Sequence, residues 1–444
     1  MTMDVHLAGL DRQRLHEAIT DPQMDSMRIL SETAMRFPQA LSFSSGAPYD
    51  GHYDPAELQR QFQRYLDHLK ERGIPDAVVN RLIHQYGPVN GFIRDEVATM
   101  LANDEQIKVT PEAIMITNGC QEAMLIVLRG LCAAPDDVLL AVSPTYVGIL
   151  GAARMLDIPL QGITEGGPDG LSPQAVAQAA RDVRAQGRRP VAVYLVPSFA
   201  NPTGTVISLQ ARRELLRIAA EENLYILEDN PYGVFAPAGE QMPTLKSLDT
   251  ERRVIYLGTF AKSAFPGARL GYLVADQVVT GAGQPDRTLA EELSKAKAMF
   301  SISSSSLSQA VIGGYLVNHG FRLRGATDKL AVIYLERLGA ALAALAEHFP
   351  PQEYDRHGVR WNAPQGGFFL SVEVSFTADL AAMERSARDY GVSWAPMSMF
   401  YIGPGSDRVI RLGISNLAPG DIREGIARFA SFVTDTTKQK TDNI

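Results

Sequence analysis

Short apolar runs alternate with longer amphipathic segments through the middle of the chain. The short runs lie at 113–117, 138–142, 192–196, 224–227, 254–257 and 270–274. Several are apolar on both faces, which is typical of strands that helices cover on both sides of a sheet. The segments with helical periodicity lie at 121–131, 172–186, 208–222 and 289–298. This alternation predicts an α/β fold with a mostly parallel, helix-sandwiched sheet.

The pattern changes after residue 318. A long helical segment at 321–348 leads into a glycine-rich strand at 366–374, and after a further helix a strand follows at 409–414. We therefore expect a large domain at 70–318, and a smaller α+β domain formed by 1–69 and 319–444. The glycine-rich run 166–170 predicts a turn.

Composition narrows the classes of protein that remain. The 444 residues are 45% hydrophobic and 21% charged, as in a globular enzyme-sized protein. A formal charge of -8 argues against nucleic acid or an anionic membrane as the main partner. Two cysteines give no disulfide framework, residues 1–30 lack the apolar core of a signal peptide, and no metal-ligand spacing involves the eight histidines. We expect a cytoplasmic protein with small-molecule ligands and no metal site.

One lysine carries the strongest chemical signal. Lys262 follows an apolar strand, with Thr259 three residues before it and Arg269 seven after. A partly neutral lysine forms a Schiff base with an aldehyde, and a hydroxyl with a two-pronged cation suits a phosphate. An isolated lysine of this kind is usually a surface residue, so the interpretation depends on other segments. Together, the three residues favour a pocket for pyridoxal 5'-phosphate (PLP).

Polar residues after two other predicted strands suit the same cofactor. Asp229 follows the strand at 224–227 and can pair with a protonated pyridine nitrogen. Tyr232, three residues on, and Asn201 in an Asn-Pro-Thr-Gly turn can both bind the ring hydroxyl. Taken alone, Asp229 is equally well a capping residue, and the tetrapeptide is more often only a turn.

Further candidates lie at the ends of the remaining strands. The segment Gly119-Cys120-Gln121 opens a helix whose free N–H groups suit a phosphate, and Tyr146 can stack on a flat ring. Arg411 interrupts an apolar strand, where its planar fork suits a carboxylate. A structural salt bridge is the alternative for Arg411.

Together, these segments resemble the class I/II aminotransferases, which are PLP enzymes of fold type I. The pieces occur in the family's order over most of the chain: Tyr86-Gly-Pro, Gly119-Cys-Gln121, Ser143-Pro-Thr-Tyr146, Asn201-Pro-Thr-Gly204, Asp229-Asn-Pro-Tyr232, Lys262 with Arg269, and Arg411. The resemblance implies a homodimer whose active sites are shared between subunits. Ala261 stands where many relatives have serine.

Carried over to this sequence, the resemblance makes Lys262 the Schiff-base lysine, with Asp229 and Tyr146 as the other expected catalytic residues. The residues that would bind the cofactor are Gly119, Cys120, Gln121, Tyr146, Asn201, Asp229, Tyr232, Thr259, Lys262, Arg269 and, from the neighbouring subunit, Tyr86. The residues that would bind the substrate are Arg411, Gly46 and Asn201.

Framework runs such as Gly119–Leu125 and Pro396–Phe400 are most similar to aminotransferases of the (S)-3,5-dihydroxyphenylglycine and 2-aminoadipate group. The resemblance implies transfer of an amino group between an amino acid and a 2-oxo acid. The substrate would be an aryl-glyoxylate, a phenylglycine or an aromatic amino acid in natural-product biosynthesis.

Two rival interpretations remain at this point. The first is a PLP enzyme that eliminates, cyclises or oxidises an amino acid such as an arginine derivative. The second is a transcription regulator with an aminotransferase-like sensor, but only about forty residues precede the first matching segment, too few for a DNA-binding domain and linker. The serine tract 301–306 fits a partner's phosphate site and a helix-capping loop equally well. Arg28 is a weaker candidate for contact with the substrate side chain.

Overall fold

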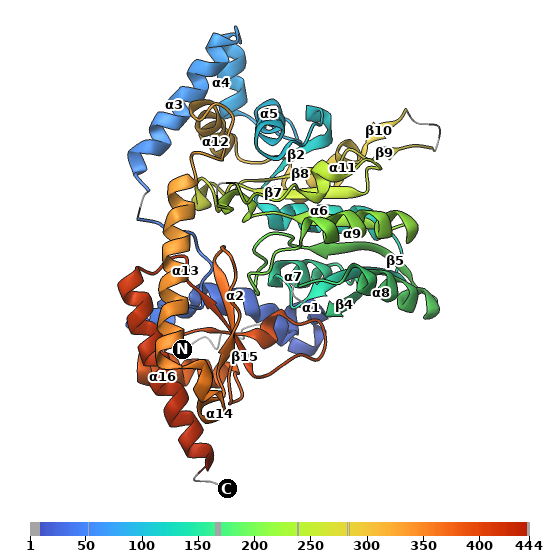
Figure 1. Ribbon diagram of the computed structural model, residues 1–444. Helices are drawn as coiled ribbons and strands as arrows, with labels where there is room; N and C mark the ends of the chain where they lie inside the picture. Colours follow the sequence, from blue (N-terminus) through green and yellow to red (C-terminus); the bar gives the residue numbers. More distant parts are fainter. Residues whose placement is uncertain are drawn as a thin grey trace, which may run out of the picture.

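A seven-stranded sheet forms the centre of the larger part of the molecule in the computed structural model (Figure 1). The structure describes residues 9–51, 53–164, 170–237, 239–281, 283 and 285–441, so most of the turn expected at 166–170 lies outside the described residues. The strand order is β2-β8-β7-β6-β5-β3-β4, and only β8 runs against its neighbours. The strands are β2 (Ile114–Thr117), β3 (Asp137–Ser143), β4 (Leu160–Thr164), β5 (Arg189–Leu195), β6 (Tyr225–Asp229), β7 (Val254–Thr259) and β8 (Gly271–Val274). The mostly parallel sheet predicted from the sequence is confirmed.

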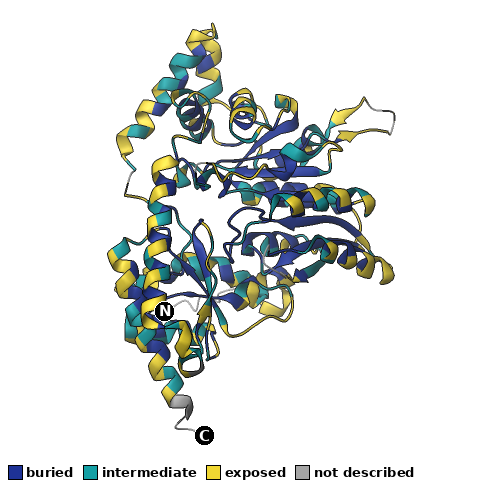
Figure 2. Ribbon diagram, in the orientation of Figure 1, coloured by how far each residue is buried: buried dark blue, intermediate teal, exposed yellow. Residues whose placement is uncertain are grey.

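Helices cover both faces of this sheet and bury its strands (Figure 2). The helices of this part are α5 (Arg94–Glu105), α6 (Cys120–Leu131), α7 (Val147–Met155), α8 (Pro173–Ala185), α9 (Leu209–Glu221), α10 (Leu245–Leu248), α11 (Leu289–Ser301) and α12 (Ser306–Asn318). A short hairpin of β9 (Val278–Val279) and β10 (Arg287–Thr288) precedes α11. Strands apolar on both faces are therefore the expected consequence of burial on both sides.

A second, antiparallel sheet lies in the C-terminal part of the chain. Its strands, in spatial order, are β11 (Arg360–Trp361), β12 (Phe369–Glu373), β15 (Val409–Gly413) and β14 (Ala395–Pro396). It shares a hydrophobic core with the helices α13 (Asp328–His348), α15 (Leu380–Tyr390) and α16 (Pro419–Thr441), and α14 (Tyr354–His357) lies beside them. In addition, β1 (Leu41–Ser42) pairs with β13 (Val392–Ser393), which ties the N-terminal segment to this part.

The N-terminal segment contributes to both parts of the molecule. The helices α1 (Glu17–Thr20) and α2 (Ser26–Arg36) lie near α7, whereas α3 (Pro55–Glu71) and α4 (Asp76–His84) pack with α12 at one end of the molecule (Figure 1). We keep the domain division at residues 70 and 318 as a proposal. No helix within the described ranges is long and apolar enough to cross a membrane.

Two of the differences from the sequence expectation have a clear physical reason. The helix expected from residue 321 begins at Asp328, because Phe321 and Gly325 both have positive φ angles, of 56° and 84°. Strand β4 was not predicted at all. It forms the edge of the sheet, and its residues are mostly half-buried, so it lacks the continuous apolar run of the other strands.

Candidate active site

The predicted site residues meet at one edge of the seven-stranded sheet. β2, β3, β5, β6 and β7 run in the same direction, so their carboxyl ends share this edge, and β8 begins there because it runs the opposite way. Ligands of open α/β sheets bind at such an edge. A cavity of about 520 Å³ lies here. It is lined by every predicted site residue except Tyr86: Gly46, Gly119, Cys120, Gln121, Tyr146, Asn201, Asp229, Tyr232, Thr259, Lys262, Arg269 and Arg411.

Lys262 lies in this cavity with its amine kept partly neutral. Burial lowers its pKa to about 8, and the positive charges of Arg411 and Arg269 act in the same direction. Its Nζ donates a hydrogen bond of 2.7 Å to the carbonyl oxygen of Gly46. Since a neutral amine is the nucleophile, a lysine in this setting is suited to attack an aldehyde near neutral pH.

Asp229 ends β6 as a fully buried carboxylate. The hydroxyl of Tyr194 donates to its Oδ2 at 2.6 Å, and the Sγ of Cys120 lies 3.6 Å from its Oδ1. Burial raises the pKa of Asp229 to about 6, although these hydrogen bonds and Lys262 favour the charged form. A ligand cation placed against Asp229 would offset the cost of its burial.

The first turn of α6 forms an anion cradle with Arg269. Gly119 precedes the helix with φ of 80°, and a Cβ there would lie 2.8 Å from Nη2 of Arg269. Glycine therefore lets the guanidinium approach the helix start, where free N–H groups point outward. Thr259 also lines this part of the cavity, and its hydroxyl accepts a hydrogen bond of 3.1 Å from the N–H of Ala261.

Arg411 is the second buried cation of the cavity, and only 2% of it is exposed. Its Nη1 donates to Oδ1 of Asn201 at 2.9 Å, its Nη2 donates to the carbonyl of Ser44, and its Nε has no hydrogen-bond partner. No carboxylate of the described residues lies within ion-pair distance of it, so the salt bridge considered as an alternative is not formed there. Burial lowers its pKa to about 10. The guanidinium is thus poised for an external anion.

Two tyrosines complete the walls of the cavity. Tyr146 directly precedes α7, and Tyr232 follows β6. Burial raises the pKa of both phenols, although Asn201 acts on Tyr232 in the opposite direction. Both groups therefore stay neutral and can serve as hydrogen-bonding or stacking surfaces.

Three candidates from the sequence lie away from this cavity. Tyr86 is 80% exposed. Arg28 projects from α2 and pairs with Asp25 at 2.9 Å and with Glu32 at 3.6 Å. In the serine tract, Ser305 caps α12 by accepting from the N–H of Ser308 at 3.2 Å, in agreement with the helix-capping interpretation.

Some site residues were not found from the sequence. Tyr194 orients Asp229, yet it sits inside an otherwise apolar strand. The one sequence feature that could have indicated this role is a tyrosine hydroxyl on a strand buried on both faces, where it needs a hydrogen-bond partner. Met27 and Leu30 of α2 also line the cavity, and an amphipathic N-terminal helix alone does not indicate where its apolar face packs.

The cavity fits PLP, the cofactor expected from the sequence. The partly neutral amine of Lys262 matches its aldehyde, and the buried carboxylate of Asp229 matches a protonated pyridine nitrogen. The cradle of Gly119 and Arg269, which a Cβ would fill, matches its phosphate. The three groups surround a single cavity, so one molecule can meet all of them.

Comparisons with known proteins agree with this chemistry. A family model described as aminotransferase class I and II matches residues 39–429. The (S)-3,5-dihydroxyphenylglycine transaminase of Amycolatopsis orientalis is 41% identical, over 96% of this chain and 95% of its own. The aromatic-amino-acid aminotransferase 1 of Thermococcus litoralis is 29% identical, over 96% and 99% of the two chains.

A solved structure also matches along nearly the whole chain. It is the α-aminoadipate aminotransferase of Thermus thermophilus in complex with N-(5'-phosphopyridoxyl)-L-leucine, with a TM-score of 0.77 and 26% identity, covering 96% of this chain and 99% of the other. These relatives are transaminases, so they do not favour the elimination, cyclase or oxidase interpretation. The chain therefore belongs to the class I and II aminotransferases, and it is a PLP-dependent enzyme that moves an amino group between an amino acid and a 2-oxo acid.

Proposed function

We propose that Lys262 is the residue that holds PLP through its amine and then moves the α-proton of the amino acid. The observation that carries this proposal is the position of its amine in the cavity, where burial beside Arg411 and Arg269 lowers its pKa to about 8. A lysine with this pKa is neutral enough to attack and basic enough to take up a proton near pH 7 to 8.

The other residues of the cavity would hold the cofactor in a fixed orientation. Asp229 would pair with the pyridine nitrogen, Asn201 and Tyr232 would bind the ring hydroxyl, and Tyr146 would stack on the ring. Thr259, Arg269 and the backbone of Gly119, Cys120 and Gln121 would hold the phosphate. When bound, PLP supplies an electron-withdrawing ring that stabilises negative charge on the substrate carbon.

Arg411 would bind the α-carboxylate of the substrate. Its fork has a free Nε and no ion-pair partner among the described residues, so a carboxylate would satisfy both charge and hydrogen bonding. The carbonyl of Gly46, which now accepts from Lys262, lies in the same cavity. The substrate carbon would thus be held between Arg411 and the amine of Lys262.

Replacement of Lys262 tests the central assignment. The variant Lys262→Ala should lose the visible absorbance of enzyme-bound PLP and its transaminase activity. Lys295→Ala is the matched control, because Lys295 is exposed on α11 and pairs only with Glu292. Retention of the visible band in Lys262→Ala would contradict the assignment, since Lys262 is the only lysine among the described residues that line the cavity.

We propose that the substrate carries an aromatic side chain, as an aryl-glyoxylate, a phenylglycine or an aromatic amino acid. The likeness to the dihydroxyphenylglycine transaminase supports this, and so do the apolar side chains of Met27, Leu30 and Val147 in the cavity wall. Among the described residues, the wall has no cation beyond Lys262, Arg269 and Arg411, and Arg28 lies outside it, paired with Asp25 and Glu32. Faster conversion of glutamate or 2-aminoadipate than of aromatic amino acids would contradict this proposal.

We also propose a homodimer. Large apolar side chains are exposed around the serine tract: Met299, Phe300, Ile302, Leu307 and Tyr86. The serine tract lies beside the segment that carries Tyr86, because the hydroxyl of Ser306 donates to the carbonyl of Gln85 at 3.5 Å. A second copy that covers this surface would bring Tyr86 to the partner's phosphate. Sedimentation as a monomer at micromolar concentration would contradict this proposal.

A place in natural-product biosynthesis and a cytoplasmic location complete the proposal. The first rests on the dihydroxyphenylglycine transaminase relative, and the second on the free thiols of Cys120 and Cys132. Deletion of the coding sequence should abolish an aryl-glycine-containing product without affecting growth on minimal medium. An amino-acid auxotrophy, or recovery of the protein outside the cytoplasm, would contradict this part.

A further inference from the structure

A second cavity of about 210 Å³ lies beside the active site, between the N-terminal segment and the helices α6 and α7. Its walls are mostly apolar and flexible, with Met24, Leu125 and Met155 among them. Methionine adapts to different shapes and makes favourable contacts with aromatic rings. A cavity of about 150 Å³ is large enough for benzene, so this one has room for a substituted aromatic ring.

The two cavities share three wall residues: Met27, Gln121 and Val147. These side chains form the boundary between them, and two of the three are apolar. Gln121 lines both cavities, so it belongs to the active-site wall as well as to the second cavity. A group that extends from the active site past Met27 would therefore enter the second cavity directly.

The N-terminal segment is fixed over this cavity by ion pairs. Arg154 near the end of α7 binds Asp21 at 2.8 Å and Glu17 at 3.1 Å. These contacts hold Met24 over α7, where its Cε lies 3.9 Å from the position a Cβ would take on Gly151. Figure 1 shows α1 and α2 beside α7. An anchored segment of the chain thus forms one wall of the cavity.

We propose that the second cavity is the subsite for the distal part of the substrate side chain. The enzyme then accepts amino acids whose aromatic ring stands one carbon beyond the α-carbon, as in the phenylalanine and tyrosine type. Gln23, Ser26 and Gln121 add amide and hydroxyl groups to the walls, which suits a ring that bears a hydroxyl. This inference rests on the proposed aromatic substrate of the same site.

Gly151 allows a direct test. It lies in the wall of the second cavity and away from the cofactor residues, and among the described residues outside its own helix turn only the flexible end of Met24 comes within 4 Å of an added Cβ. Gly151→Leu should fill the subsite, and it replaces glycine in a helix by a better helix former. We expect kcat/KM for phenylalanine to fall about tenfold to two-hundredfold, while kcat/KM for alanine stays the same.

The matched control is Gly339→Leu. Gly339 lies in the helix α13 with nothing within 4 Å of an added Cβ, so the same substitution there should leave all substrates unaffected. In the opposite direction, Met155→Ala enlarges the subsite and should favour homophenylalanine, whose ring stands one carbon farther out.

The outcomes separate this inference from the proposed function. If the wild-type enzyme does not convert aromatic amino acids, the proposed substrate class fails. If it converts them, but Gly151→Leu lowers kcat/KM for phenylalanine and alanine equally or changes neither, the subsite is overturned and the substrate class stands. Selective loss of phenylalanine turnover supports both.

Discussion

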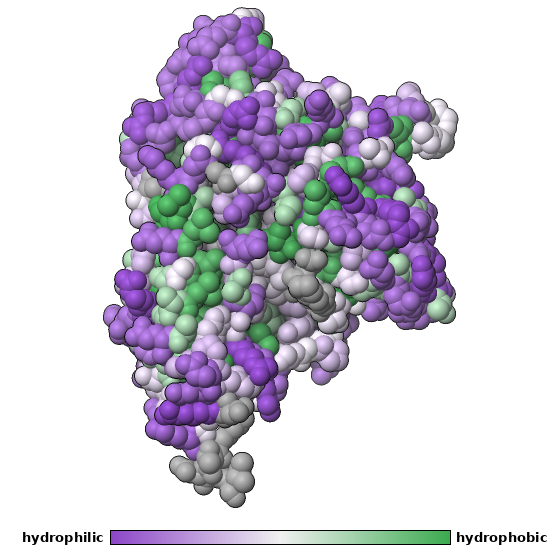
Figure 3. All heavy atoms as spheres, in the orientation of Figure 1, coloured by the Kyte–Doolittle hydropathy of each residue, from purple (hydrophilic) through white to green (hydrophobic). Residues whose placement is uncertain are grey.

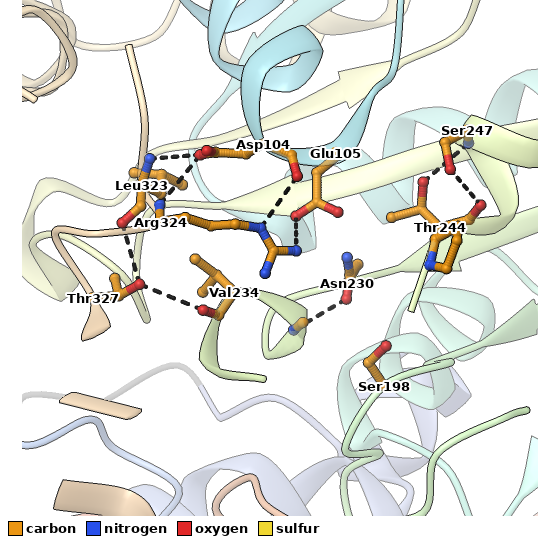
Figure 4. A network of polar contacts seen from close by, with 12 residues as sticks. Asp104, Glu105, Ser198, Asn230, Val234, Thr244, Ser247, Leu323, Arg324 and Thr327 are labelled. Carbon is orange, nitrogen blue, oxygen red and sulfur yellow. Dashed lines mark hydrogen bonds and ion pairs between the residues drawn. The ribbon is translucent and has the colours of Figure 1, made fainter. Parts of the chain in front are cut away.

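Two arginines, the buried Arg411 and the partly buried Arg324, differ in the charges that surround them. In the network of Figure 4, Arg324 lies between α12 and α13, and its Nη2 contacts Oε1 of Glu105 at 3.1 Å. Its Nε donates to the backbone oxygen of Asp104 at 3.1 Å. Among the described residues, Arg411 hydrogen-bonds the amide oxygen of Asn201 and a backbone carbonyl, and it lies over the rings of Phe369 and Phe400 without a carboxylate partner. Each guanidinium keeps one nitrogen without a hydrogen bond, so the difference between them lies in charge pairing.

The comparison shows how a buried charge indicates function. A buried cation is costly unless a carboxylate pairs with it or hydrogen bonds satisfy it. Arg324 finds a carboxylate within its own fold, and the buried Arg212 is satisfied by backbone carbonyls and a serine hydroxyl. Arg411 has no carboxylate within reach among the described residues, and it faces a cavity. Its pairing partner is therefore expected to arrive with the substrate.

Figure 3 shows hydrophobic residues gathered in the middle of one face, with hydrophilic residues predominating above them.

Loss of the structural pair should produce the largest effect on stability. Arg324→Ala leaves Glu105 buried without its partner, and we expect the free energy of unfolding to fall by about 3–5 kcal/mol. Chemical denaturation measures this change. Arg322→Ala is the control, because the half-exposed Arg322 lies 3.7 Å from the buried Asp104, which keeps its hydrogen bonds from the N–H groups of Leu323 and Arg324, so this pair should contribute about 0–1 kcal/mol. Equal losses of unfolding free energy in the two variants would contradict the claim that Arg324 is stabilised by its pair with Glu105.

Loss of the unpaired arginine should affect binding more than folding. Arg411→Ala should weaken amino-acid binding by about 2–5 kcal/mol, since a desolvated carboxylate loses its partner. Its unfolding free energy should change less than that of Arg324→Ala, because no carboxylate of the described chain is left behind. Binding is measured by titration of the cofactor absorbance. An unchanged affinity for amino acids would show that Arg411 is structural.

A smaller effect should follow from removing the hydroxyl that orients Asp229. Tyr194→Phe deletes the 2.6 Å hydrogen bond to Oδ2, and hydrogen bonds to charged groups contribute about 1.5–3 kcal/mol. The pKa of Asp229 should rise, so the pH profile of the bound cofactor's absorbance should shift while the protein stays folded. Tyr256→Phe is the control, because its hydroxyl bonds Asn230 instead. A similar shift in both variants would exclude a specific role for Tyr194.

The smallest expected effect is on the rate of PLP capture by the unmodified enzyme as pH changes. Below its pKa, Lys262 is an ammonium that cannot attack, and above it the amine is free, so PLP capture by the cofactor-free enzyme should accelerate as pH rises through about 8. An ordinary lysine would respond near about 10.4. Stopped-flow absorbance across this range measures the midpoint. A midpoint near 10 would show that burial and the neighbouring arginines do not act on Lys262.

The degree of burial of each strand, and the distance along the chain between contacting residues, explain what the sequence could and could not predict. Strands such as β3 and β5 are apolar on both faces, so the sequence predicts their burial. The polar residues that follow them lie close together because the carboxyl ends of parallel strands share one edge of the sheet. Strand β4 was missed because an edge strand is half-buried. Tyr194 and Met27 were missed because their roles depend on neighbours far along the chain, Asp229 and Val147.

The most direct test of the unpaired charge compares a substrate with its neutral analogue. Wild-type enzyme and Arg411→Ala are titrated with phenylalanine and with phenylalaninamide, which lacks the carboxylate, and binding is followed through the cofactor absorbance. We predict that the wild type binds the acid far more tightly than the amide, and that this preference disappears in Arg411→Ala. A preference of equal size in both proteins would contradict the account, because the carboxylate would then be recognised by another group.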